Sequence, residues 1–245
     1  MATVGGLLAA PLAAQAQSRG KTWRVGFLSG SARPPDDAVP LSLRQALQEL
    51  GYVEQQNVVY LGRWAEAKQD RLPGLAAELV GLKVDVIVTT GGPASGAAKR
   101  ATSSIPIVLA QVGDADGLGL IESLARPGGN VTGVTDQSVE LSAKRLTALN
   151  RKRVIDFALV HRIPAMYEFS FLVRDGGLMS YGANQDDNYR KVASYVDRIF
   201  KGAAPSSLPV ERPGRYYLTI NLKTAKALGL ALPQSLLLRA DQVIE

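Results

Sequence analysis

In the first 135 residues, short apolar runs alternate with segments whose apolar side chains recur at helical spacing. The runs predict strands at residues 24–28, 57–62, 84–88, 105–110 and 131–134. Helices are predicted between them: one capped by Ser42 and ended by Gly51, one capped by Asp70, one starting at Pro93 and one following Asp114. Such alternation is typical of a complete, doubly wound α/β lobe with a parallel sheet.

The pattern changes after residue 135. Residues 140–162 form one continuous helical pattern that contains neither glycine nor proline. Strands are predicted only at 163–169, 177–181 and 216–221, with helices at 186–201 and 222–228 and a polar, proline-rich crossing at 205–213. Three strands after residue 135 against five before it predict two halves of unequal size.

Two consecutive strands of the first half end in loops suited to a small ligand. Ligands of open parallel sheets bind at the carboxyl ends of the strands, where helix N-termini offer N–H groups. The backbone of Gly92, Pro93 and Ala94, with the Thr90 hydroxyl, suits a carboxylate, and Asp114 suits an ammonium group. Ser29, which ends the first strand, is expected at the same rim. Alternatively, Thr90 and the glycines are only turn residues, and Asp114 is only a helix cap.

The composition excludes several kinds of functional site. The chain has 245 residues, 46% of them apolar, and a net charge of +6 spread along its length, which indicates a mildly basic globular protein. Without cysteine and with one histidine, it offers no thiol nucleophile, disulfide or Cys/His zinc site. No segment interleaves basic and aromatic residues as a nucleic-acid surface does. No Gly-x-Gly-x-x-Gly turn follows the first strand, general bases are scarce, and Ala97 stands where a phosphate loop needs lysine. We therefore expect no enzyme, no cofactor, no metal and no nucleic-acid partner.

The first 16 residues are predicted to be a signal peptide. Gly5 to Ala13 is an uncharged, mostly apolar stretch too short to span a bilayer, and Ala14-Gln15-Ala16 fits a cleavage site. The basic region that normally precedes such a stretch is missing, and a disordered Ala-rich tail is the alternative. No other run of 18 apolar residues occurs, so the mature chain is expected to be periplasmic and not inserted in a membrane.

Taken together, these motifs resemble those of bacterial ABC-transporter substrate-binding proteins, in the family that includes tryptophan- and tyrosine-type binders. The resemblance runs in order over nearly the whole chain. The matching stretches are Trp23 to Ser29, Leu47 to Val53 (LQELGYV), Arg63 to Glu66, Asp70 to Pro73, Val84 to Pro93, Ile105 to Val108, Val112 to Asp114, Leu124 to Gly133 (LARPGGNVTG), Ile163 to Phe169 (IPAMYEF), Gly176 to Gly182 (GGLMSYG) and Ile220 to Leu230 (INLKTAKALGL).

The resemblance implies an α/β fold with two Rossmann-like lobes of the type I periplasmic-binding-protein kind and a ligand between them. Lobe one would comprise residues 21–135 and 184–206, and lobe two residues 136–183 and 207–245. On lobe two, Tyr167, Glu168 and Tyr181 end strands and would stack on or hydrogen-bond to a ligand, unless the tyrosines are core aromatics. The implied role is binding a small molecule, an amino acid or more narrowly an aromatic amino acid, for a membrane permease and its ATPase. A ligand-sensing module for a membrane receptor is an alternative.

The resemblance breaks between Asn150 and Arg151. Family members continue there into further strands and helices of lobe two, and on the order of 60 to 80 residues, about two βαβ-sized pieces, are missing from this chain. The second lobe is therefore expected to be truncated, with exposed sheet edge and apolar helix faces, and to be destabilised or remodelled. A non-functional, internally deleted remnant is a further alternative.

Overall fold

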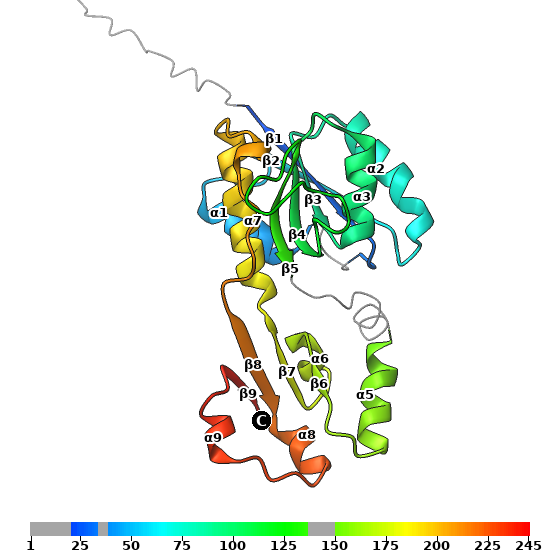
Figure 1. The fold of residues 1–245 in the computed structure, drawn as a ribbon, viewed down its shortest axis with the longest axis vertical. Helices are drawn as coiled ribbons and strands as arrows, with labels where there is room; N and C mark the ends of the chain where they lie inside the picture. The colour runs from blue at the N-terminus through cyan, green and yellow to red at the C-terminus, as the bar shows by residue number, and fades with distance from the viewer. Residues whose placement is uncertain (1–20, 34–38, 137–149) are drawn as a thin grey trace, which may run out of the picture.

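The computed structural model describes residues 21–33, 39–136 and 150–245. They form two α/β lobes, a larger one built on strands β1 to β5 and a smaller one built on β6 to β9 (Figure 1). The expected two-lobed α/β fold is confirmed. No helix within these three ranges is long and apolar enough to cross a bilayer. The predicted signal peptide, residues 1–16, lies outside them.

All neighbouring strands of the larger lobe's sheet are parallel, in the order β2-β1-β3-β4-β5. Their bounds are β1 Trp23–Ser29, β2 Val58–Trp64, β3 Val86–Thr90, β4 Ile107–Gly113 and β5 Val131–Asp136. Helices cover both faces of the sheet, so its central strands are apolar on both sides. Phe27 and Leu28 of β1, for example, point to opposite faces and are both fully buried. The chain order reverses between β1 and β3, and open sheets bind ligands at such a reversal.

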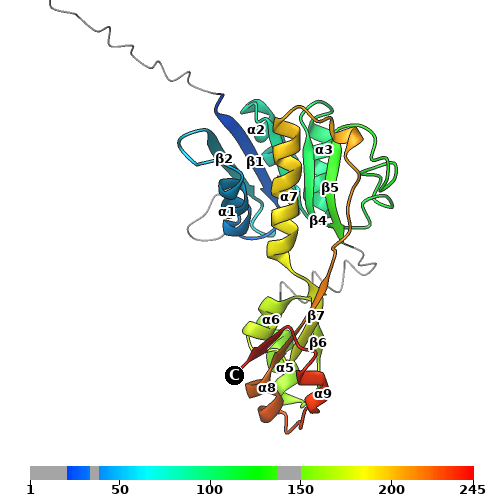
Figure 2. The same ribbon diagram turned by 90° about the vertical axis from the view of Figure 1, so that its left-hand side faces the viewer.

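Helices lie on both faces of this sheet (Figure 2), and each face has its own apolar core. One core contains side chains of α1 (Leu41–Glu49) and α7 (Gln185–Phe200). The other contains side chains of α2 (Leu72–Gly81), which follows the 3₁₀ turn η1 (Gln69–Arg71), and of α3 (Gly92–Ala101). Helix α7 follows the first strands of the smaller lobe in the chain, yet it packs on the larger lobe. Its Phe200 stacks on Trp23 of β1 with 4.0 Å between ring centroids.

The sheet of the smaller lobe has the strand order β6-β7-β8-β9. Strands β6 and β7 are parallel, β7 and β8 antiparallel, and β8 and β9 parallel. The elements of this lobe are α5 Arg151–Val160, β6 Met166–Tyr167, α6 Ser170–Arg174, β7 Met179–Ala183, β8 Tyr216–Asn221, α8 Leu222–Ala227, α9 Gln234–Leu237 and β9 Gln242–Ile244.

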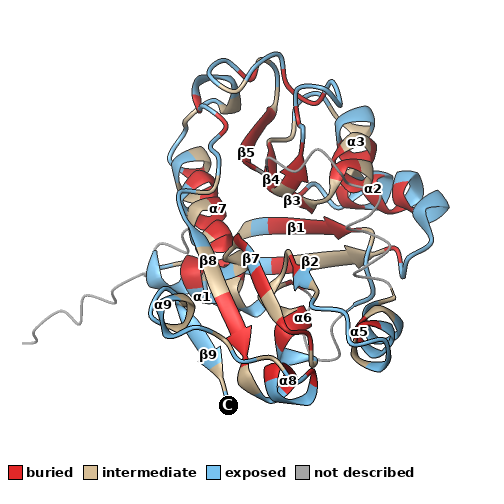
Figure 3. Ribbon diagram, turned by 60° about the horizontal axis from the view of Figure 1, so that its bottom comes forward, coloured by how far each residue is buried: buried red, intermediate tan, exposed pale blue. Residues whose placement is uncertain are grey.

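The smaller lobe has modest cores, and much of its helix α5 is exposed (Figure 3). In helix α5 only Ile155 and Ala158 are buried, whereas Phe157 is 58% and Val160 78% exposed. Strand β6 has two residues, and in the part of the chain that the structure describes it pairs with β7 alone. This lobe therefore has the exposed sheet edge and apolar helix face expected of a truncated lobe.

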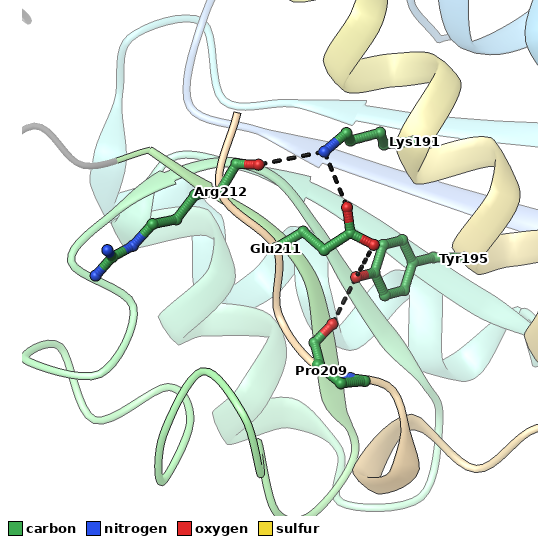
Figure 4. Close-up of polar contacts among 5 residues, drawn as sticks. All are labelled: Lys191, Tyr195, Pro209, Glu211 and Arg212. Atoms are coloured by element: carbon green, nitrogen blue, oxygen red, sulfur yellow. Dashed lines mark hydrogen bonds and ion pairs between the residues drawn. The ribbon is translucent and has the colours of Figure 1, made fainter. Parts of the chain in front are cut away.

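The chain returns from the larger to the smaller lobe through a segment bound to both β5 and α7. After the 3₁₀ turn η2 (Pro205–Ser207), the Glu211 N–H donates to the Gly133 carbonyl at 2.9 Å. The Tyr195 hydroxyl donates to the Pro209 carbonyl at 2.5 Å, and the Lys191 ammonium donates to the Glu211 carboxylate at 2.9 Å (Figure 4). The Lys191 bond lowers the pKa of Glu211.

Some predicted elements agree closely with the structure, whereas several helix starts differ. Strand β8 has the predicted bounds, and helix α7 begins and ends one residue earlier than predicted. Ser42 and Asp70 do not cap helices: Pro40 precedes α1, and Asp70 lies inside η1. The helix predicted after Asp114 is absent: residues 114–130 consist of turns, bends and irregular backbone.

The strand predictions for the smaller lobe also need correction. The strand predicted at 163–169 is reduced to the two residues of β6, and that predicted at 177–181 is β7, shifted by two residues. Strand β9 was not predicted, so this lobe has four strands among the described residues rather than three. Of the continuous helix predicted at 140–162, α5 is observed and residues 140–149 lie outside the described ranges.

Candidate functional site

The candidate site lies at the carboxyl edge of the larger lobe's sheet, on the side that faces the smaller lobe (Figure 1). Strands β1 and β3 are neighbours, and their last residues, Ser29 and Thr90, stand opposite each other in the register. They mark the point where the strand order reverses. The sequence predicted both residues at one rim, and the fold brings them into direct contact.

Three hydroxyl side chains form a network at this point. Thr90 donates to the Ser29 oxygen at 2.9 Å, and the Ser29 and Ser31 oxygens are 2.8 Å apart. The Ser31 backbone N–H also donates to Ser29, at 3.2 Å. Ser29 is only 2% exposed, so the network holds it in place. Because each hydroxyl can rotate to donate or accept, such a network can turn donors toward an anionic ligand.

Helix α3 starts beside these hydroxyls. Its N-cap is Gly91, whose φ of 78° lies in the left-handed region that glycine tolerates. No side chain caps the N-terminus of the helix. Gly92 and Ala94 can offer N–H groups there, whereas Pro93 has none. Ser95 bonds instead to Thr89, with 2.7 Å between the oxygens. The uncapped helix start carries a partial positive charge that favours a carboxylate.

A hollow of about 350 Å³ adjoins the same helix start. It is lined by Gly92 and Pro93 on one side and by residues of α2 on another. The Leu118 side chain approaches Gly92 closely: a Cβ placed on Gly92 would lie 2.7 Å from it. Residue 92 must therefore be small for the loop after β4 to pack against the start of α3.

Asp114 follows β4, the strand next to β3, and has an exposed side chain. Its φ of 50° lies in the left-handed region, and its carboxylate accepts the Gly117 N–H at 3.1 Å. Asp114 thus closes a local turn. The same exposed carboxylate can still accept a ligand's ammonium group.

On the smaller lobe, β6 and β7 run toward the larger lobe, because β7 leads directly into α7. Tyr181 of β7 is 56% exposed and stacks on Tyr216 of β8 with 5.7 Å between ring centroids. Tyr167, by contrast, is 7% exposed and packs with Ile155 and Leu172, and burial raises its pKa. Its ring belongs to the core of the lobe. Glu168 follows it and is partly buried.

Two neighbours of the candidate residues were not predicted from the sequence. Ser31 lies two positions after Ser29, and its place in the Ser-Gly-Ser turn could have indicated a second hydroxyl at the rim. Tyr216 becomes the partner of Tyr181 only through the antiparallel pairing of β7 with β8, which no local pattern reveals. Within the described ranges, no group of three or more His, Asp or Glu side chains could hold a metal ion.

Comparisons with known proteins give one family. The family model described as "ABC transporter substrate binding protein" matches residues 32–146 and 143–244. The two matches meet at 143–146, close to the junction where the resemblance was seen to break. A curated "Tyrosine-binding protein" of Clostridioides difficile (strain R20291) is 31% identical over 116 residues, which are 47% of this chain and 34% of that protein. The match thus spans about a third of the curated relative.

Solved structures show the same fold. An ABC domain from Streptococcus pneumonia in complex with L-Trp has a TM-score of 0.79 at 23% identity, with 91% of this chain and 100% of that chain covered. A conserved domain protein from Vibrio cholerae has a TM-score of 0.77 at 23% identity and the same coverage. The ligand-free, open form of a Clostridium difficile substrate binding protein with adhesive properties has a TM-score of 0.70 at 20% identity, with 91% and 99% covered.

Proposed function

Because the chain belongs to the ABC transporter substrate binding protein family, we propose that it is the periplasmic component of an ABC importer and binds a free amino acid, aromatic in character, between its lobes. One observation carries the proposal: the hydroxyls of Ser29, Ser31 and Thr90 meet beside the uncapped start of α3, where the strand order reverses. Such a place favours a small ligand with a carboxylate.

Each group of an amino acid has a partner in this proposal. The carboxylate accepts from the N–H groups of Gly92 and Ala94 and from the Thr90 hydroxyl, which rotates away from Ser29 to donate to it. The ammonium group binds the Asp114 carboxylate, because a charge-assisted hydrogen bond is about twice as strong as a neutral one. An aromatic side chain stacks on Tyr181, which is exposed and already held by Tyr216. The names of the relatives, a tyrosine-binding protein and a domain in complex with L-Trp, agree with an aromatic ligand.

The proposed role is binding and delivery rather than catalysis. Closure of the smaller lobe over the ligand would present both lobes to a membrane permease, which works with its ATPase. The smaller lobe contributes the Tyr181 platform but has a thin core, so closure is the step most affected by truncation. Ligand binding is consequently the function to measure first.

Thermal shift and calorimetry with L-Trp, L-Tyr and L-Phe test the proposal, with glycine as the reference amino acid. We expect the aromatic amino acids to raise the melting temperature, since a ligand at one hundred times its Kd stabilises by about 2.7 kcal/mol. The shift should disappear in Asp114→Ala and persist in Asp116→Ala, whose exposed carboxylate lies two residues further along the same turn. If no amino acid binds, or if both variants behave alike, the proposed site is wrong.

A further inference from the structure

A second hollow, of about 440 Å³, lies in the smaller lobe beside the chain crossings between the lobes. Its walls come from α6, from the start of α7 and from the beginning of β9, and its floor is the sheet of β7 and β8. Figure 3 shows β7 and β8 between α6 and β9. A volume of this size accommodates a small molecule. None of Ser29, Thr90, Asp114 and Tyr181 lines it.

The floor carries the hydroxyl groups of two largely buried residues. Ser180 and Thr219 are direct cross-strand partners and are 1% and 2% exposed. Within the described ranges, neither hydroxyl makes a hydrogen bond, although both residues line the hollow. Both hydroxyls open onto the hollow, where a ligand or solvent can bond to them.

Two arginine side chains line the rim, and they differ in whether their guanidinium group is already paired. The Arg215 guanidinium is paired with Asp241 and lies over the Tyr217 ring, 4.7 Å from its centroid. The Leu218 N–H and Arg215 hold the pKa of Asp241 below its usual range. Arg174, the last residue of α6, has no ion pair among the described residues and lines the same hollow. One guanidinium is thus held in place, and another is available to an incoming anion.

We propose that this hollow is a second ligand site, separate from the site between the lobes, and that it takes a small hydroxy-carboxylate. The carboxylate binds the Arg174 guanidinium, whose paired N–H groups match two carboxylate oxygens. The hydroxyl groups of the ligand bind Ser180 and Thr219 on the floor. An apolar ligand is disfavoured, because it would leave both hydroxyls unpaired.

The test uses D-glycerate and L-malate as probes and glycerol as the neutral control, with binding to the full chain measured by calorimetry. We expect both carboxylates to bind and glycerol to bind far more weakly. Arg174→Gln should weaken glycerate binding at least about tenfold. Arg153→Gln is the matched control, because it removes the same charge from an exposed position on α5 in the same lobe.

Two further variants separate binding from folding and from the site between the lobes. Thr219→Val removes a floor hydroxyl at nearly constant volume, so it should keep or raise the melting temperature while weakening glycerate binding. Asp114→Ala should leave glycerate binding unchanged. The proposal is overturned if neither carboxylate binds, if glycerol binds as well as glycerate, if Arg174→Gln and Arg153→Gln bind alike, or if Asp114→Ala abolishes the binding.

Discussion

The Tyr195 hydroxyl fixes the return crossing to the larger lobe, and its removal has a calculable cost. Tyr195 is 2% exposed, and its O–H donates to the Pro209 carbonyl at 2.5 Å, with the Glu211 carboxylate 3.2 Å away. In Tyr195→Phe the ring keeps its packing, but the carbonyl loses its donor. A neutral hydrogen bond contributes about 0.5–1.5 kcal/mol. Because Pro209 is exposed, water can replace the donor in part, so we expect a loss of about 1 kcal/mol.

Tyr189→Phe on the same helix is the matched control. Tyr189 is 8% exposed, and its hydroxyl makes no hydrogen bond to any described residue, so its removal should cost less than about 0.5 kcal/mol. Urea unfolding followed by circular dichroism measures both variants. Hydrogen exchange of the Val210 and Glu211 amides, which donate to Leu124 and Gly133, should become faster only in Tyr195→Phe. Equal stability and equal exchange in the two variants would refute the reasoning.

Three further outcomes are expected. Gly182→Ala should destabilise the smaller lobe by about 1–3 kcal/mol in a denaturant melt, because its Cβ would lie 1.9 Å from the Glu168 carbonyl oxygen; an unchanged melt would contradict the packing of β6 on β7. The bond from Lys191 lowers the pKa of Glu211, so the carboxylate stabilises the fold above its ordinary pKa and stops doing so as the pH falls through the lowered value. Wild type should therefore lose more stability than Glu211→Gln between about pH 5 and pH 3 in acid titrations of unfolding, and parallel profiles would count against this. Phe157→Lys should reduce self-association in light scattering without lowering the melting temperature, since the side chain is 58% exposed; a large drop in melting temperature would show that it packs.

The larger lobe could be predicted from the sequence because its elements are specified locally. Apolar runs at β1, β3 and β4 and the helical spacing of α2 and α3 are visible without knowledge of distant contacts. Strands β3 and β4 extend beyond the apolar runs to Thr90 and Gly113, since their last residues still pair with neighbouring strands. The helix predicted after Asp114 does not form, because the Asp114 carboxylate and carbonyl instead accept the N–H groups of Gly117 and Leu118 and close a turn.

The smaller lobe and its part of the candidate site depend on distant pairings. Strand β9 has three residues and exists because it pairs with β8, which no local pattern specifies. Both tyrosines were predicted to end strands, but Tyr181 lies in the middle of β7, and only packing decides that Tyr167 points into the core and Tyr181 to the surface. Ser29 and Thr90 could be placed together in advance, because the carboxyl ends of parallel strands share one edge.

The position of α7 also determines the order in which the molecule can be completed. Tyr52 donates a hydrogen bond to Asp197, 145 residues later in the chain. While the protein is being synthesised, the part of this sheet face that α7 covers therefore stays exposed until the first strands of the smaller lobe have emerged, although α1 already covers its neighbouring part. Contacts between such distant segments form slowly and leave apolar surface open to aggregation in the meantime. A smaller lobe that folds poorly would delay α7, so damage to one lobe would lower the yield of the other.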